Sequence, residues 1–125
     1  MSVQFVLWDH DGVLVDTEPL FFEATARVLA LQAEGRGIVR LLEEVDIKGA
    51  AQAEVRRVRN ALYEELLAER DVLIDGARRA VEDVATAYRS VMVTTSLRRH
   101  VDQIHRRSGI LEHFEHVVTA EDCEI

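Results

Sequence analysis

Residues 5–18, FVLWDHDGVLVDTE, decide the fold of this chain. The first four residues of the stretch are continuously apolar, which predicts a strand buried on both faces. Asp9 and Asp11 follow at once, and Gly12 allows the backbone to turn tightly behind them. Because ligands of open parallel sheets bind beyond the carboxyl ends of the strands, the stretch predicts a polar site there.

The rest of the chain alternates between helical and extended patterns. Pro19 suits a first helical turn, and Asp75-Gly76 interrupts the pattern that follows. Helical spacing of apolar residues predicts helices over 19–32, 38–45, 53–70 and 77–88. SVMVTTS (90–96) and FEHVVTAED (114–122) predict two further strands, and between them Ser96 is expected to cap a helix that Gly109 closes. The order predicts an α/β fold with a parallel sheet and a helical insertion after the first strand.

Composition narrows the class of protein and of partner. The chain has 125 residues, enough for one domain, and a net charge of −8, which disfavours binding to nucleic acid. It has no apolar run long enough to span a membrane and no signal-peptide pattern. Its single cysteine, Cys123, favours a cytoplasmic location and shows no partner expected of a nucleophile.

The ends of the first two predicted strands carry complementary chemistry. Asp9 and Asp11 can divide the work of nucleophile or metal ligand and of proton shuttle. The second strand ends on hydroxyl side chains, among which that of Thr94 suits a phosphate oxygen. One or two carboxylates with a substrate phosphate form a typical Mg²⁺ site.

DHDGVLVDTEPLFFEA (9–24) closely resembles the first motif of the haloacid dehalogenase superfamily, in its phosphatase and β-phosphoglucomutase-like branch. VMVTTSLRRH (91–100) resembles the second motif, and GILEHFEHVVTAED (109–122) resembles the segment that follows it. The resemblance implies a Rossmann-like core formed by residues 1–17 and 88–125, with a helical cap over 18–87.

By this resemblance, Asp9 is the nucleophile that forms an aspartyl-phosphate, and its carboxylate binds Mg²⁺. Asp11 is the general acid and then the base that activates water, and its main-chain carbonyl faces the metal. Thr94, with Thr95 adjacent, binds the phosphoryl group. The implied function is that of a Mg²⁺-dependent phosphatase for a small phosphorylated metabolite, and Asp9→Asn is expected to abolish turnover.

The sequence departs from the family pattern in its later motifs. The family needs a lysine in a third motif and acidic residues in a fourth, whereas Lys48 is the only lysine here and lies in the cap region. We therefore expect a chain truncated after the third core strand, with a metal site short of one carboxylate. Because the fourth strand of the family would be absent, the strand at 4–8 should lie open along one edge and favour self-association.

Three alternatives to a phosphatase remain open. A catalytically silent binding protein would keep the first two motifs and bind Mg²⁺ or substrate without turnover. A mutase would pass the phosphoryl group to a sugar hydroxyl instead of water. A receiver-like phosphoacceptor domain fits the length, but such domains need a lysine near the end of the chain.

Other polar residues have simpler explanations. Strand alternation should point His10 away from the neighbouring aspartates, and the remaining histidines show no metal-ligand spacing. Asp16 is expected to support the loop. Arg98 and Arg99 are expected to be exposed helix charges, with contact to a substrate anion as the alternative.

Overall fold

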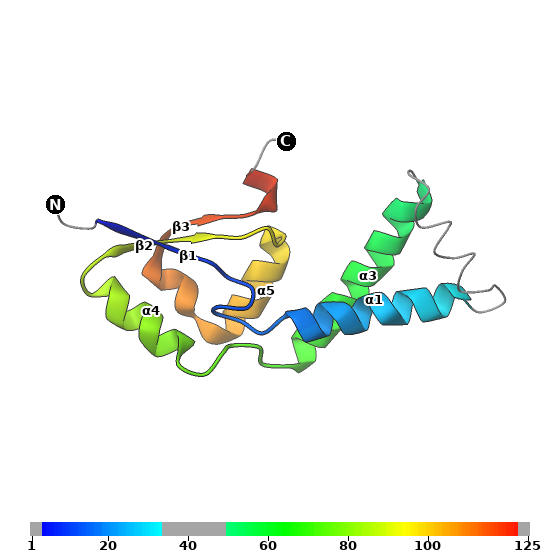
Figure 1. Cartoon of the computed structure of the whole chain (residues 1–125), viewed down its shortest axis with the longest axis horizontal. Helices are drawn as coiled ribbons and strands as arrows, with labels where there is room; N and C mark the ends of the chain where they lie inside the picture. The colour runs from blue at the N-terminus through cyan, green and yellow to red at the C-terminus, as the bar shows by residue number, and fades with distance from the viewer. Residues whose placement is uncertain (1–3, 34–49, 123–125) are drawn as a thin grey trace. The chain divides into compact units, whose positions relative to one another are not determined.

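Three parallel strands form one sheet in the order β1-β2-β3. The computed structural model describes residues 4–33 and 50–122. The strands are β1 (Phe5–Trp8), β2 (Arg89–Val93) and β3 (Phe114–Val118). Because all three run in the same direction, their carboxyl ends share one edge of the sheet, as the sequence predicts (Figure 1).

The helices lie where the apolar spacing predicts them. They are α1 (Glu18–Ala33), α3 (Ala50–Glu69), α4 (Ala77–Ala85) and α5 (Arg98–Ser108), with short 3-10 helices η1 (Ile110–His113) and η2 (Ala120–Asp122). The predicted helix over 38–45 lies outside the described residues. An insertion that contains α1 and α3 therefore separates β1 from β2 in the sequence, which confirms the expected order of elements.

The chain divides into two compact units, Met1–Glu18 with Arg70–Ile125, and Pro19–Glu69. The sequence prediction placed residues 70–87 in the cap, whereas α4 belongs to the unit that contains the sheet. The physical reason is burial, because Ala77 and Val81 of α4 are both buried and α4 contacts β2 and η1.

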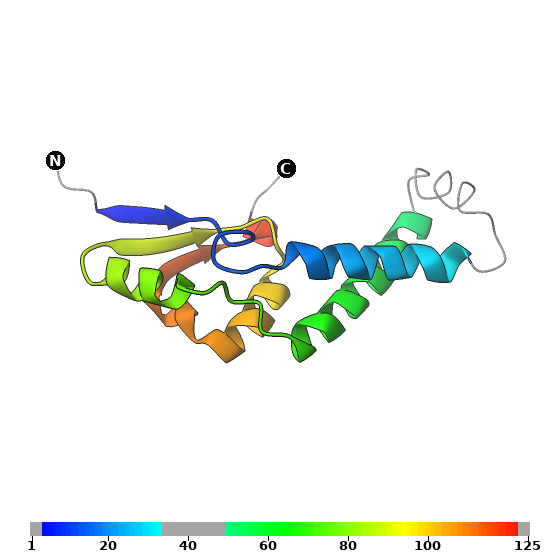
Figure 2. The same ribbon diagram turned by 60° about the horizontal axis from the view of Figure 1, so that its bottom comes forward.

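One face of the sheet carries the core of the first unit. Figure 2 shows α4 and α5 on the same side of the strands. On that side, the indole Nε1 of Trp8 donates to Ser90 Oγ at 3.1 Å, and the Trp8 ring meets Phe114 edge-on with centroids 6.5 Å apart. Met92 lies in the same layer and is fully buried. These contacts join the three strands through side chains as well as through the backbone ladder.

The other face of the sheet is more exposed than the sequence suggests. Phe5 and Leu7 are 43% and 70% exposed, so the prediction that this strand is buried on both faces is wrong. Two features explain the difference. Among the described residues, β1 pairs only with β2, and both helices of this unit lie on the opposite face. The prediction that β1 forms an open edge is confirmed for the described part of the chain.

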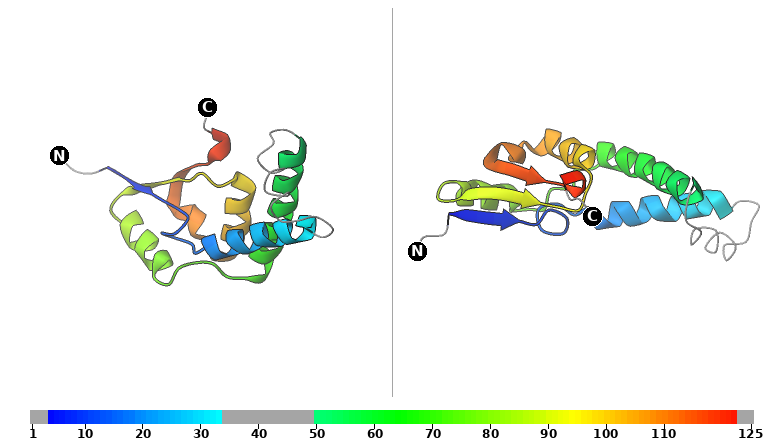
Figure 3. Two further views of the ribbon diagram at one scale, coloured as in Figure 1. Left: turned by 45° about the vertical axis from the view of Figure 1, so that its right-hand side comes forward. Right: turned by 90° about the horizontal axis from the view of Figure 1, so that it is seen from above.

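The second unit contains the helices α1 and α3. Figure 3 shows the first turns of α1 beside the C-terminal half of α3. Phe21 of α1 meets Tyr63 of α3 edge-on, with ring centroids 5.5 Å apart and the Arg59 guanidinium 4.6 Å from the centre of the Phe21 ring. Ala24 and Val28 are buried on the same helix. Within residues 4–33 and 50–122, no helix combines the length and the apolar character that crossing a bilayer requires.

The one-sided sheet predicts unequal effects of two adjacent truncations in β2. Met92 is fully buried beneath the helices, whereas Val93 is 44% exposed on the other face. Met92→Ala should therefore lower the free energy of unfolding by about 2–5 kcal/mol, the usual result of removing a large buried side chain. Val93→Ala should lower it by less than about 1 kcal/mol. Urea titrations of both variants measure the difference, and similar losses would contradict one-sided burial.

Candidate active site

The loop after β1 is fastened to the rest of its unit by backbone hydrogen bonds. Gly12 has a φ of 81° and donates its N–H to Val15 O at 2.8 Å, which closes a tight turn. The positive φ explains the glycine, because other residues rarely adopt that conformation. The Asp16 N–H then donates to Val72 O at 2.7 Å. Asp16 therefore supports the loop through its main chain, and the two aspartates before it are held on a fixed turn.

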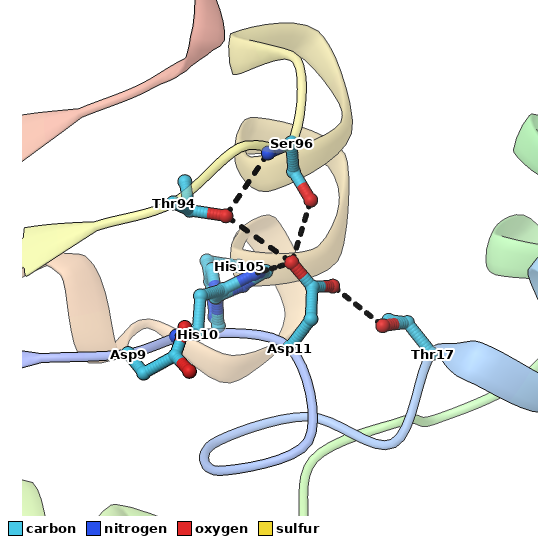
Figure 4. A network of polar contacts seen from close by, with 7 residues as sticks. All are labelled: Asp9, His10, Asp11, Thr17, Thr94, Ser96 and His105. Carbon is cyan, nitrogen blue, oxygen red and sulfur yellow. Dashed lines mark hydrogen bonds and ion pairs between the residues drawn. The ribbon is translucent and has the colours of Figure 1, made fainter.

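The carboxylate of Asp11 is the centre of the site (Figure 4). Its Oδ2 accepts hydrogen bonds from Ser96 Oγ at 2.6 Å and from Thr94 Oγ1 at 3.1 Å. Its Oδ1 accepts one from Thr17 Oγ1 at 2.5 Å. The Nδ1 atom of His10 lies 3.3 Å from Oδ2. Four polar side chains, two from the loop after β1 and two from the turn after β2, thus converge on one carboxylate.

These donors determine the charge of Asp11. Burial by itself would raise the pKa of this carboxyl group, but hydrogen bonds from His10, Ser96 and Thr17 outweigh it and hold the pKa well below its usual range. In this arrangement Asp11 is an ionised hydrogen-bond acceptor at any ordinary pH.

Asp9 occupies a different environment. Its side chain is exposed, and Oδ1 accepts a hydrogen bond from the main-chain N–H of His10 at 2.8 Å. Figure 4 shows the Asp9 carboxylate lying apart from the Thr94–Ser96 pair. Of the two aspartates, Asp9 is therefore the one open to a ligand.

The second strand delivers its polar residues unequally. Thr94 is buried, donates to Asp11, and accepts a hydrogen bond from the Ser96 N–H at 3.1 Å. Thr95 is exposed between them. The structure thus brings together Asp11 and Thr94 of the predicted site residues, and leaves Asp9 and Thr95 outside this hydrogen-bonded network.

Two sequence predictions about neighbouring residues are wrong. Ser96 does not cap α5, whose N-cap is Leu97 without a side-chain hydrogen bond, because the Ser96 hydroxyl is engaged by Asp11. His10 does not point away from both aspartates, because β1 ends at Trp8 and strand alternation no longer applies to the turn. The expected closure of α5 by Gly109 is confirmed, with a φ of 70°.

Arg98 is exposed, as predicted, but its side chain also makes directed contacts. The Arg98 guanidinium lies 44% exposed, and its Nη2 donates to Asp122 Oδ2 at 3.0 Å and to Val117 O at 2.7 Å. It therefore ties the start of α5 to η2 and to the end of β3.

A second histidine joins the site from α5. Nε2 of His105 lies 2.8 Å from Nε2 of His10, and Nδ1 of His105 lies 2.6 Å from Ser108 Oγ. Both rings are buried. Burial and the neighbouring His10 lower the pKa of His105 to about 4. The sequence gives little signal for this pair, since 95 positions separate its members and neither has metal-ligand spacing.

The oxygen atoms of the site suit a hard cation such as Mg²⁺ only in part. Mg²⁺ binds oxygen ligands and keeps several waters, so the exposed Asp9 carboxylate suits it as one ligand. The Asp11 carboxylate oxygens are engaged by hydroxyl donors. Within residues 4–33 and 50–122, no group of three or more histidine, cysteine or acidic side chains is arranged to hold a metal ion.

Comparisons with known proteins agree with this architecture. The family of haloacid dehalogenase-like hydrolases matches residues 3–125. A phosphorylated carbohydrates phosphatase of Thermotoga maritima is 29% identical over 135 residues, which cover 93% of this chain and 61% of the relative. This chain therefore spans less than two thirds of that protein.

Solved structures show the same fold. CbbY of Rhodobacter sphaeroides, solved with phosphate and, as a variant, with xylulose-(1,5)bisphosphate, has a TM-score of 0.74 and 20% identity over 99% of this chain and 66% of CbbY. YfnB of Bacillus subtilis, solved with magnesium, has a TM-score of 0.64 and 18% identity over 95% of this chain and 66% of YfnB. Likeness at these identities establishes the fold: a partial α/β core of this family with a helical insertion.

The depressed pKa of His105 predicts a loss of stability in mild acid. Below its unfolded pKa of 6.5 and above its folded pKa of about 4, the unfolded chain binds a proton that the native state does not. The free energy of unfolding should therefore fall by roughly 3 kcal/mol between about pH 6.5 and 4. Protonation of Asp11 affects stability in a separate, lower pH range. Because the pKa of this carboxyl group is lowered on folding, its contribution to the free energy of unfolding is lost only below about pH 4.

Chemical denaturation at several pH values measures this dependence. His105→Gln should flatten the profile between about pH 6.5 and 4, whereas His116→Gln, at an exposed position of β3, should leave it as in the wild type. An unchanged slope in His105→Gln would show that this imidazole is not the responsible group.

Proposed function

Because the chain belongs to the haloacid dehalogenase-like hydrolases, we propose that it is a Mg²⁺-dependent phosphatase that forms an aspartyl-phosphate on Asp9. The observation that carries the proposal is the pairing of two unlike carboxylates. Asp9 is exposed after β1, and Asp11, two residues later, is held by the hydroxyls of Thr94 and Ser96. A nucleophile must be open to substrate, whereas a proton shuttle benefits from positioning by neighbours.

The first step of the proposed reaction uses Asp9. Its carboxylate oxygen attacks phosphorus, the bond to the leaving oxygen breaks, and the phosphoryl group is transferred to the carboxylate. Asp11 donates a proton to the leaving oxygen, so that an alcohol departs. In the second step Asp11, now ionised, takes a proton from water, which attacks the aspartyl-phosphate and regenerates Asp9. Mg²⁺ held by Asp9 and the main-chain carbonyl of Asp11 would offset the charge of the phosphate.

Asp11 must gain a proton before it can act as the acid, and substrate binding provides a reason for it to do so. A phosphoryl oxygen that accepts hydrogen bonds from Thr94 and Ser96 would withdraw those donors from Asp11. The negative charge of the phosphate would act in the same direction, because both changes raise the pKa of a carboxyl group. The hydroxyl pair thus serves the ionised Asp11 in the resting site and the phosphoryl group in the complex.

A phosphorylated carbohydrate is the substrate class that we propose. The Thermotoga relative is named for such substrates, and CbbY has been solved with a sugar bisphosphate. With a net charge of −8, a bound divalent cation would offset locally the repulsion of an anionic substrate. Transfer to a sugar hydroxyl, as in a mutase, would use the same two aspartates.

A binding protein without turnover is the second candidate. The observation that favours it is the donor set, because the described residues do not gather three metal ligands around the site. The only lysine of the sequence, Lys48, lies outside the described residues. Such a protein would retain the affinity of Thr94 and Ser96 for phosphate.

Replacing the two aspartates distinguishes these candidates. Asp9→Asn should abolish Mg²⁺-dependent hydrolysis of p-nitrophenyl phosphate, since an amide cannot accept the phosphoryl group. Asp11→Asn should reduce kcat by about 10²–10⁴-fold, the usual contribution of general acid–base catalysis. Asp102→Asn, at an exposed position of α5, is the matched control and should keep wild-type activity. A folded wild-type chain without turnover, or an active Asp9→Asn variant, would reject the proposed mechanism.

Isosteric replacement of the two threonines tests where phosphate binds. Thr94→Val removes a buried hydroxyl that contacts Asp11, so the inhibition constant of inorganic phosphate should rise by about tenfold, equivalent to one hydrogen bond to a charged group. Thr95→Val should raise it by less, because its side chain is exposed beside the network. Competitive inhibition assays with inorganic phosphate measure both, and a larger effect at Thr95 would reverse the assignment.

A further inference from the structure

A continuous line of polar contacts runs from the site into the core of its unit. It joins Asp11 Oδ2 to His10, His10 to His105, and His105 to Ser108, at 3.3, 2.8 and 2.6 Å. His10 is 0% exposed, His105 3% and Ser108 7%. Burying polar groups such as these destabilises the folded state unless their hydrogen bonds are satisfied. The three side chains must therefore satisfy one another's hydrogen bonds.

The contact between the two rings restricts where hydrogens can lie. Two Nε2 atoms 2.8 Å apart have room for one hydrogen between them, so one ring donates and the other accepts. The Asp11 carboxylate at the outer end is an acceptor only, which requires a hydrogen on His10 Nδ1. If His10 is neutral, its Nε2 must then accept, and His105 must donate from Nε2.

The contact between His105 and Ser108 fits the same direction of hydrogen bonding, in which each inner residue donates to the next one outward. A His105 ring with its hydrogen on Nε2 presents Nδ1 as an acceptor, and the Ser108 hydroxyl can donate to it. The oxygen of Ser108 still accepts the N–H of Ile110, at 3.3 Å. All donors and acceptors are then satisfied without placing a charge on either buried ring. The opposite direction would turn the His10 Nδ1 lone pair toward a carboxylate or require an imidazolium in a fully buried position.

We propose that His105, oriented by Ser108, is a positioning residue that fixes His10 in the tautomer whose Nδ1–H points at Asp11. This arrangement exists without substrate and does not depend on the reaction. Its effect on catalysis rests on the proposed function. When a phosphoryl group takes the hydroxyls of Thr94 and Ser96, the His10 N–H remains as a donor from the protein core that keeps the Asp11 carboxylate in place.

Long-range ¹H–¹⁵N NMR of the chain labelled at histidine nitrogens, at pH 7.5, reports the tautomers directly. In the wild type, His10 should carry its hydrogen on Nδ1 and His105 on Nε2. His105→Gln keeps an N–H donor at a similar position and should preserve the His10 tautomer. His105→Leu removes the donor, so His10 should show averaged nitrogen shifts that indicate exchange between tautomers. Loss of one signal set in each His105 variant identifies that ring.

Activity supplies the second readout, with p-nitrophenyl phosphate and Mg²⁺. His105→Leu should lower kcat by about tenfold or more with little change in KM, and His105→Gln should restore most of it, because displaced supporting partners typically weaken a site by such factors. If His105→Leu does not fold, Ser108→Ala replaces it and should release the His105 tautomer and, through it, that of His10. Circular dichroism checks folding in each case.

Three results would overturn the proposal. They are a wild-type His10 without a hydrogen on Nδ1, a His10 with hydrogens on both nitrogens at pH 7.5, and a His10 tautomer that stays unchanged in a folded His105→Leu variant. Absence of turnover in the wild type would reject the proposed function alone, because the NMR spectra decide the positioning role without it.

Discussion

The parallel pairing of β1 with β2 is the constraint on which the site depends. Phe5 lies opposite Arg89 and Trp8 opposite Met92, so the turn after β1 and the turn after β2 emerge at the same edge. That register places Asp11 beside Ser96, although the two are 85 positions apart in the sequence. A shift by one residue would reverse the face on which every side chain of β1 lies, and would remove the Trp8–Ser90 contact that fixes the alignment.

Electrostatics then differentiates the two aspartates that the strand delivers. Asp9 and Asp11 are chemically identical, and only their surroundings make one available and the other engaged. Asp9 accepts a main-chain N–H and stays exposed, whereas Asp11 contacts hydroxyl donors on both of its oxygens and the buried imidazole of His10. Division of labour between neighbouring carboxylates by environment is a general way in which one motif supplies both a nucleophile and a proton carrier.

The sequence predicts well the features that depend on local pattern. Within residues 4–33 and 50–122, the strands, the helices and the turn at Gly12 follow from apolar spacing and backbone preference, and they are found as expected. It fails where tertiary contacts compete with a local rule. Ser96 has the right type and position for a helix cap, but its hydroxyl donates to a carboxylate from the other end of the chain, and the N-cap of α5 is the next residue, Leu97. The exposure of Leu7 has the same origin, because an apolar run does not reveal whether an element covers its second face.

The buried histidines are a second example of tertiary contacts that local sequence rules do not predict, and they lie behind the groups that would react with substrate. His10 stands between two acidic residues in a turn, yet its ring enters the core and meets His105 of α5. An apolar side chain at position 105 would leave His10 Nε2 buried without its hydrogen-bond partner, which lowers stability. The hydrogen bonds of His10, His105 and Ser108 are therefore satisfied only when all three polar residues are present. Their directional hydrogen bonds couple the orientation of Asp11 to the packing of α5, so that a helix outside the motif contributes to the geometry of the site.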